Sequence, residues 1–263
     1  MIKFFRHIRK NLLMENKTSK YFKYAIGEII LVMVGILLAL QVNNWNEQRI
    51  EKQQESAILS QLLLEFKSNL EQLDQKISSK NETINSALQL FKYIDLEELR
   101  NKDSVDYHLA RTIPFTTFDP IVNNLAISGE LRLIKNDSLK QKLTYWTSEI
   151  ADLREDELSW AEYRENKYVP FLVKYYQLRT IRSKAAKENL LGQYLIEDQF
   201  NTKTYEIGKS KHLEDYNVLL DQPDYEDHLE RCLTKNKHSL NQSLILRQKI
   251  VDILNILNSE INR

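Results

Sequence analysis

The chain has little cysteine, proline or glycine, and each shortage narrows the folds that it can adopt. Cys232 is the only cysteine among 263 residues, so no disulfide can form within one chain. Proline occurs four times and glycine five times. Because these residues interrupt helices and mark turns, a chain so poor in both should form long helices. The sequence therefore predicts an all-α fold without a disulfide framework.

Common catalytic motifs are also missing. There is no glycine-rich phosphate loop, no His-Glu-x-x-His zinc pattern and no Gly-x-Ser-x-Gly nucleophile elbow. His228 has Asp224 and Cys232 one helical turn away on either side, but no further metal ligands can be assigned. We predict no catalytic residue, no cofactor and no metal site. An envelope enzyme with a titratable cleft in its helices is the alternative.

Charge is balanced over the whole chain but is distributed unevenly. The chain has 37 basic and 37 acidic residues. Residues 1–23 contain a single acid, Glu15, and seven basic residues: Lys3, Arg6, Arg9, Lys10, Lys17, Lys20 and Lys23. Because basic residues remain on the cytoplasmic side of a membrane segment, this tail predicts a cytoplasmic N-terminus.

An apolar segment, Ala25 to Val42, follows this basic tail. Extended to Trp45 it gives a helix of about 30 Å, roughly one hydrocarbon thickness. A cleaved signal peptide is the competing interpretation, although Ala39-Leu40-Gln41 is a poor cleavage site. We therefore predict a basic cytoplasmic tail over 1–23, an uncleaved transmembrane anchor over 24–45 and an extracytoplasmic helical domain over 46–263.

Two features within the anchor suggest contact with another membrane helix. Gly27, Gly35 and Ala39 fall near one helix face, and Gly35-x-x-x-Ala39 is a small-xxx-small pair that permits close approach. Glu28 is a carboxylate near the cytoplasmic border of the apolar segment, where such groups often mark a partner or an ion path. A purely interfacial role, with Glu28 reached by Lys23 or lipid headgroups, is the alternative.

Three short motifs in this region resemble a family of uncharacterised bacterial single-pass membrane proteins. YAIGEI, GILLALQ and NNWNE stand between Tyr24 and Glu47, and a further block, LAISGELRLIKNDSLKQKLTYW, spans Leu125 to Trp146. The resemblance implies a membrane-anchored helical protein of the bacterial inner membrane. It implies no activity and no catalytic residue.

The domain after the anchor shows a coiled-coil-like repeat. The stretch from Gln41 to Ser56 has almost no apolar stripe and should continue the membrane helix as a solvated stalk. A seven-residue series then follows: Leu63, Leu70, Ile77, Ile84 and Phe91. A second series, Phe66, Leu73, Ala87 and Ile94, is interrupted by Lys80. These series predict a seam that packs on the later helices of an antiparallel bundle, with a parallel homodimer as the alternative.

Prolines, helix-capping residues and lapses in the apolar pattern predict further helix boundaries. The pattern lapses from Asp103 to Pro120, which predicts a loop there. Asn136 should cap a long helix whose stripe includes Glu157 and Trp160, and Pro170 should kink or end that helix near Tyr168. Pro223 should open a helix to about Lys237, followed by a separate last helix.

Aromatic and basic residues concentrate on both sides of Pro170, from Trp160 to Tyr176. The candidate binding surface comprises Trp160, Tyr163, Arg164, Tyr168, Tyr175 and Tyr176. Such residues recognise glycans, acidic partners or nucleic acid, but an extracytoplasmic location excludes nucleic acid. Core packing with solvated charges is the alternative.

Together these features predict a non-enzymatic, membrane-tethered helical module that binds a protein or ligand of the bacterial cell envelope. Its expected partners are the lipid bilayer and an envelope or membrane protein. Two other functions remain open: a small subunit of a membrane complex, or a ligand-sensing module that signals through a separate output protein.

Overall fold

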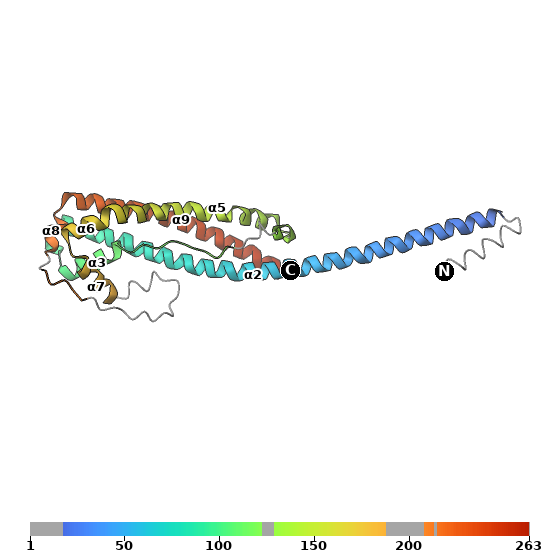
Figure 1. Cartoon of the computed structure of the whole chain (residues 1–263), viewed down its shortest axis with the longest axis horizontal. Helices are drawn as coiled ribbons and strands as arrows, with labels where there is room; N and C mark the ends of the chain where they lie inside the picture. Colours follow the sequence, from blue (N-terminus) through green and yellow to red (C-terminus); the bar gives the residue numbers. More distant parts are fainter. Residues whose placement is uncertain (1–17, 123–128, 188–207, 213–214, 263) are drawn as a thin grey trace. The chain divides into compact units, whose positions relative to one another are not determined.

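The computed structural model describes residues 18–122, 129–187, 208–212 and 215–262, and their regular structure is helical (Figure 1). This confirms the all-α prediction for the described residues. The elements are α2 (Thr18–Asp95), η1 (Glu97–Leu99), α3 (Lys102–Thr112), η2 (Glu130–Leu133), α5 (Asp137–Tyr163), the π-helix η3 (Arg164–Tyr168), α6 (Val169–Tyr175), α7 (Leu178–Lys187), α8 (Tyr216–Leu220) and α9 (Pro223–Ile261).

The N-terminal part of α2 contains one segment that is long and apolar enough to cross a membrane. No residue in the most apolar part of this segment is buried, and large side chains from Ile26 to Val42 are exposed. Such a run is too apolar to remain exposed to water over its whole surface. Residues Met1–Ala57 form one compact unit, and Ile58–Arg263 form a second.

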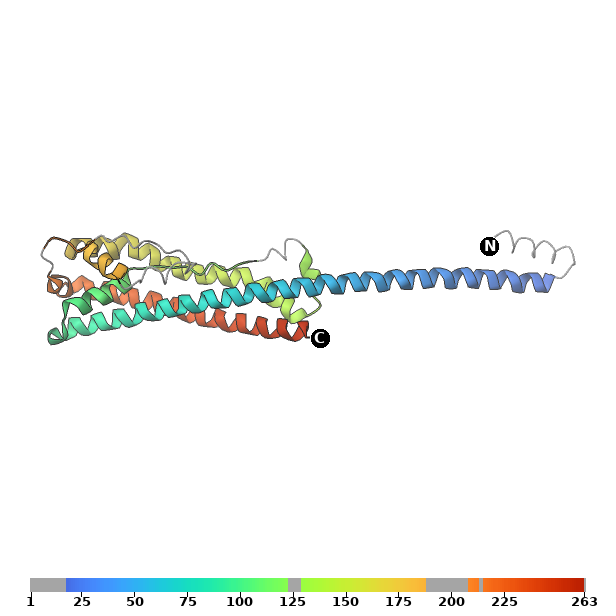
Figure 2. The same cartoon turned by 90° about the horizontal axis from the view of Figure 1, so that it is seen from below.

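Three long helices make up most of the second unit: the Ile58–Asp95 part of α2, α5 and α9. They lie side by side in both views (Figures 1 and 2). The rings of Phe66 and Trp146 lie 5.0 Å apart, and Lys80 contacts Glu157, so α5 runs in the same direction as α2. Asp74 contacts Arg247 of α9, and Lys80, further along α2, contacts the earlier residue Ser243, so α9 runs opposite to both. We refer to these three helices as the bundle.

The buried stripe of α2 differs from the predicted seam. Phe66, Leu73 and Ala87 of the second series are buried as expected, whereas Ile94 is half-buried. Lys80, which interrupts this series, is buried as well, and the row from Leu63 to Phe91 is only half-buried. The second fully buried row lies one position earlier: Leu62, Asn69, Lys76, Thr83 and Leu90. Because three members of this row are polar, the sequence does not show it as an apolar stripe, and the neighbouring apolar residues indicate the wrong buried face of α2.

Asn69 and Lys76 of this row contact an extended segment that runs from Ile113 to Val122 along α2. The backbone N–H and C=O groups of this segment need hydrogen-bond partners, which explains why these positions of the row are polar. The Asn69 side chain donates to Ile121 O at 2.9 Å and accepts from Ile121 N at 2.8 Å. Lys76 Nζ donates to Thr116 Oγ1 at 2.5 Å. Backbone groups outside regular structure need such partners when they are buried. This segment also carries the chain back along α2, so that α5 begins beside the start of the bundle and runs parallel to α2.

Apolar side chains form two separate cores. The aliphatic core contains Leu62, Phe66, Leu73, Phe118, Leu139, Trp146, Leu153, Leu246, Ile250 and Leu257, among others. The aromatic core contains Leu90, Leu109, Trp160, Tyr168, Leu172, Tyr176, Tyr225, Leu229 and Cys232, together with residues of α7 and α8. All three long helices contribute to both cores.

Helix ends confirm some local predictions and overturn others. Asn136 caps α5 by accepting from Leu139 N at 2.9 Å. The predicted loop from Asp103 is wrong over Lys102–Thr112, because the Asn101 side chain accepts from two backbone N–H groups and starts α3. Pro223 lies in the first turn of α9, but α9 continues unbroken to Ile261, and the predicted break near Lys237 does not occur.

Pro170 changes the helix locally instead of ending it. Proline has no N–H and collides with the carbonyl four residues earlier, so an α-helix cannot pass it unchanged. Here Val169 N donates to Arg164 O, five residues back, and Arg164–Tyr168 form one turn of π-helix. The turn inserts extra backbone between α5 and α6, which widens the helix beside α9.

Candidate functional site

Between the two cores lies a group of buried polar side chains that we call the polar layer. It contains Lys76, Ser79, Lys80 and Thr83 of α2, Glu157 of α5, and Asn236, Ser239 and Ser243 of α9. These positions follow the same three-four spacing as the apolar residues before and after them. Each long helix therefore interrupts its apolar stripe at the same level of the bundle.

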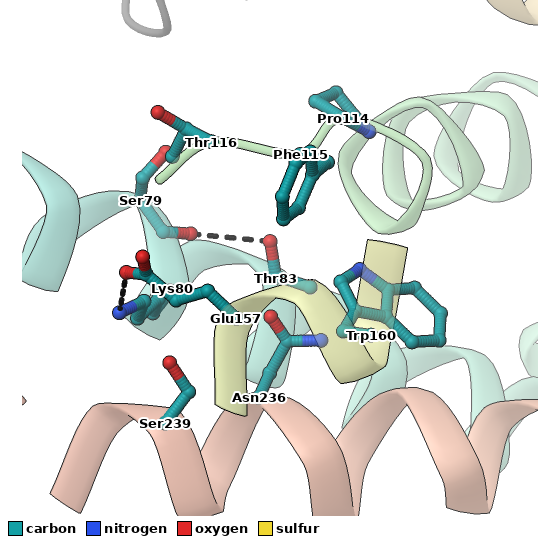
Figure 3. A pocket seen from close by; sticks show the side chains of 10 residues that line it. All are labelled: Ser79, Lys80, Thr83, Pro114, Phe115, Thr116, Glu157, Trp160, Asn236 and Ser239. Atoms are coloured by element: carbon teal, nitrogen blue, oxygen red, sulfur yellow. Dashed lines mark hydrogen bonds and ion pairs between the residues drawn. The ribbon is translucent and has the colours of Figure 1, made fainter. Parts of the chain in front are cut away.

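A buried ion pair stands at the centre of the polar layer. Lys80 Nζ lies 2.7 Å from Glu157 Oε1 and donates to Ser243 Oγ at 2.7 Å (Figure 3 shows the pair). Glu157 Oε2 accepts from Phe118 N at 2.9 Å. Burial lowers the pKa of Lys80, and the Glu157 charge opposes that shift. The pair thus joins all three long helices and the extended segment.

Lys76 brings a second ammonium group to the same region. Its side chain is only 3% exposed, and burial lowers its pKa, with the nearby charge of Glu157 opposing the shift. Thr83 Oγ1 lies 3.1 Å from both Ser79 O and Arg111 O. The polar layer is therefore tied to the backbone at several points, which favours a single register of the helices.

His228 of α9 is surrounded by rings of α5, η3 and α6. The His228 ring centroid lies 5.8 Å from that of Tyr163, 5.9 Å from Tyr168 and 4.4 Å from Phe171. Tyr163 OH and His228 Nδ1 are 3.0 Å apart. Partial burial lowers the pKa of His228 and raises that of Tyr163, so the neutral forms of both groups are favoured.

An open groove of about 790 Å³ runs over this pair, between the α5–η3 junction and the first half of α9. Charged side chains of both signs stand along its walls, and Lys235 Nζ donates to Ser159 Oγ at 2.5 Å. The lining residues are Ser159, Glu162, Tyr163, Asn166, Lys167, Asp227, His228, Glu230, Arg231 and Lys235. We call this depression the α5–α9 groove.

The predicted aromatic binding surface proves to be mainly core. Trp160, Tyr168 and Tyr176 are each less than 5% exposed, and Tyr176 OH donates to Asp106. Arg164 and Tyr175 are half-buried, and Arg164 Nη1 donates to Ile113 O at 2.9 Å. Among the six predicted residues only Tyr163 lines the α5–α9 groove. Its other lining residues have no distinguishing sequence pattern, because they come together only when α5 packs on α9.

The candidate membrane-contact residues lie in the apolar part of α2. Gly27, Gly35 and Ala39 are exposed, and Glu28 is partly exposed. A Cβ atom placed on Gly27 or Gly35 would meet nothing within 4 Å. The described chain thus leaves space on this face for a neighbouring helix or lipid.

The structure does not bring Asp224, His228 and Cys232 together as three ligands of one ion. No cluster of three metal-ligating side chains occurs in the described part of the chain. Cys232 is a free, fully buried thiol whose pKa is raised by burial, so its predicted inert character agrees with its surroundings.

The polar layer was not predicted from the sequence, although two of its residues occupy unusual positions in the apolar patterns. Lys80 interrupts an apolar seven-residue series, and Glu157 occupies a core position in the stripe of α5. Two opposite charges at core positions of different helices indicate a buried ion pair. Pairing them from the sequence would have required the relative register of α2 and α5.

Comparison with known proteins gives one match. Residues 28–119 match a family of unknown function, DUF6090. These residues include most of α2, all of α3 and the extended segment up to Asp119, whereas α5 and α9 lie outside. No curated protein and no solved structure matches the chain. The match agrees with the resemblance to an uncharacterised family, and the block from Leu125 to Trp146 lies beyond the matched residues.

Proposed function

We propose that this protein is a single-pass membrane protein whose bundle lies outside the cytoplasm and binds a protein or small ligand of the cell envelope in the α5–α9 groove. The groove itself carries the proposal, because it is the place where aromatic, acidic and basic side chains converge on an open surface. Ligand sites commonly combine concave shape with a few convergent polar groups.

The local backbone supports this assignment. Tyr163, Asn166 and Lys167 reach the groove from the π-helical turn and its flank, and single π-turns within α-helices are frequent at functional sites. Beneath them, Trp160 stacks on Tyr163 with ring centroids 6.2 Å apart. The groove therefore has a packed floor, which reduces the ordering required when a ligand binds.

The membrane anchor and its orientation rest on the exposed apolar segment of α2 and the basic residues before it. Labelling of single cysteines in a Cys232→Ser protein tests them. A cysteine at Lys237 should react with an impermeant reagent in intact cells, and one at Lys10 should react only after permeabilisation. The reverse pattern would refute the orientation.

Photo-crosslinking tests the groove. A photoreactive residue at Arg231, which lines the groove, should give a discrete crosslinked product in intact cells. The same residue at Lys237, exposed on α9 outside the groove lining, is the matched control and should not. Equal products at the two positions, or none at either, would contradict a binding role for the groove.

A second function, a small subunit of a membrane complex, is favoured by the open space at Gly35 and by Glu28 within the apolar segment. Glu28→Gln and Gly35→Leu should then reduce the size of the complex on native gels. Leu37→Ala, about 200° around the helix from Gly35, should leave it unchanged. An unaltered complex in all three variants would exclude this function.

A further inference from the structure

A small cavity lies inside the polar layer, between the two apolar cores. It offers about 20 Å³ to the centre of a water-sized sphere. Its walls come from all three long helices and from the extended segment, as Figure 3 shows. The lining residues are Ser79, Lys80, Thr83, Pro114, Phe115, Thr116, Glu157, Trp160, Asn236 and Ser239.

Three polar atoms of this lining have no hydrogen-bond partner within the described chain: Ser79 Oγ, Trp160 Nε1 and Ser239 Oγ. One comes from α2, one from α5 and one from α9. Their side chains are 4%, 3% and 3% exposed, so bulk solvent does not satisfy them. Buried polar groups in folded proteins are nearly always paired with protein atoms or ordered water.

We infer that the cavity is a binding site for ordered water, with the Trp160 indole N–H as a donor to it. A cavity of this size holds about one water molecule by the usual minimum of roughly 10–15 Å³. The chemistry of the lining favours water because an indole N–H only donates, whereas a seryl hydroxyl can donate or accept. A water molecule can accept a hydrogen bond from the indole N–H, and it can either donate to a seryl hydroxyl or accept from it.

A small anion is the competing ligand, since Lys76 and Lys80 bring two positive charges and Glu157 one negative charge to the layer. However, Glu157 lines the cavity with a carboxylate, and Asn236 lines it with an amide whose Nδ2 already donates to Cys232 O at 2.8 Å, which leaves the amide oxygen. An anion would be repelled by the first, and it has no proton to donate to the second. Water has no such conflict.

This site would place water between two apolar cores and directly behind the α5–α9 groove. Trp160 connects the two places, because its ring stacks on Tyr163 of the groove and the residue also lines the cavity. Its N–H has no partner within the described chain. The inference does not depend on the proposed function, because the site would bind water whether or not the groove binds a ligand.

The chain contains three tryptophans, which makes indole NMR a direct test. The full chain, deuterated and labelled with ¹⁵N-tryptophan, is placed in detergent micelles, and the Trp160 signal is assigned from a Trp160→Phe variant. The Trp160 indole proton should show a dipolar contact with long-lived water, with NOE and ROE of opposite sign. Absence of this contact would overturn the inference.

Two further measurements separate water from its alternatives. Ser239→Val fills the cavity and removes one hydroxyl, so it should abolish the water contact while the Trp160 signal stays at a native-like shift. The matched change Ser259→Val, at an exposed position of α9, should leave the contact intact. A Trp160 shift that responds to bromide but not to gluconate at equal ionic strength would show an anion site and refute the water site.

Discussion

The aliphatic and aromatic cores share the same three helices but are built differently. In the aliphatic core, leucine and isoleucine predominate and the long helices pack on one another and on Phe118. In the aromatic core, α3, α6, α7 and α8 join the ends of the long helices, and the side chains include Trp160, Tyr168 and Tyr176.

This difference leads us to interpret the aromatic core as the region suited to recognition. Buried tyrosines carry a hydroxyl that must be paired, and Tyr168 OH lies 2.7 Å from Thr112 Oγ1. This bond joins α3 to the π-helical turn η3, and the Tyr168 ring lies 5.9 Å from that of His228 beside the α5–α9 groove. We interpret the aliphatic core, which consists mainly of leucine and isoleucine, as a scaffold that follows the apolar segment of α2 in the chain.

The largest expected effect comes from breaking the ion pair that separates the cores. Glu157→Leu leaves Lys80 buried without its carboxylate and should lower the free energy of unfolding by about 3–5 kcal/mol. Lys80→Met should be similarly damaging, whereas the double variant should recover most of the loss. Urea unfolding of the micelle-bound chain, followed by circular dichroism, measures all three.

The Lys249–Glu149 pair, which joins α9 to α5, is the control for the buried pair of α2 and α5. It is partly exposed, with Nζ 2.5 Å from Oε1, so Lys249→Met should cost less than about 1 kcal/mol. If the losses of the two buried single variants simply add in the double variant, the polar layer is not held together by this pair.

Cavities within each core should have the next largest effect and should reveal whether the cores are independent. Leu73 and Leu229 are both fully buried, one in each core, and replacing either with alanine should cost about 2–5 kcal/mol. Hydrogen exchange should accelerate mainly in the core that carries the change. Equal acceleration in both cores after either change would show that they unfold as one unit.

Removing a helix cap from either core should cause a smaller loss of stability. Asn101 caps α3 of the aromatic core, and Asn136 caps α5 at the aliphatic core. Alanine at either position should cost about 1 kcal/mol, and serine should restore most of it. Thermal unfolding curves for the four variants test this, and a serine variant as unstable as its alanine counterpart would argue against capping.

The smallest effect should be a pH dependence specific to the aromatic core. Burial lowers the pKa of His228, so the unfolded chain takes up the proton more readily than the folded chain. Stability should therefore rise with pH from that lowered value up to the ordinary pKa of about 6.5, and fall on acidification. His228→Gln should flatten this slope in urea unfolding curves recorded across this pH range.

Some of this architecture could be predicted from the sequence because local rules determine it. The apolar segment of α2, the scarcity of breakers, the Asn136 cap and the disturbance at Pro170 each depend on residues close together in the chain. These predictions agree with the structure, in which the disturbance before Pro170 takes the form of a π-turn, Arg164–Tyr168, between α5 and α6.

The rest depended on tertiary partners. Asn69 and Lys76 look like surface residues until the extended segment packs against them, and this concealed the true buried row of α2. In the same way, the α5–α9 groove exists only once two helices 60 or more residues apart in sequence are brought together. Of the residues in the predicted aromatic surface, only Tyr163 lines this groove.

Hydrogen exchange in native membranes tests the binding role of the groove most directly. Compared with the purified chain in nanodiscs, residues 159–167 and 227–235 should exchange more slowly in native membranes, and the aliphatic core should be unchanged. Arg231→Glu should remove the difference. Protection confined to residues 25–45, or no protection at all, would contradict the account and would place any partner elsewhere than the groove.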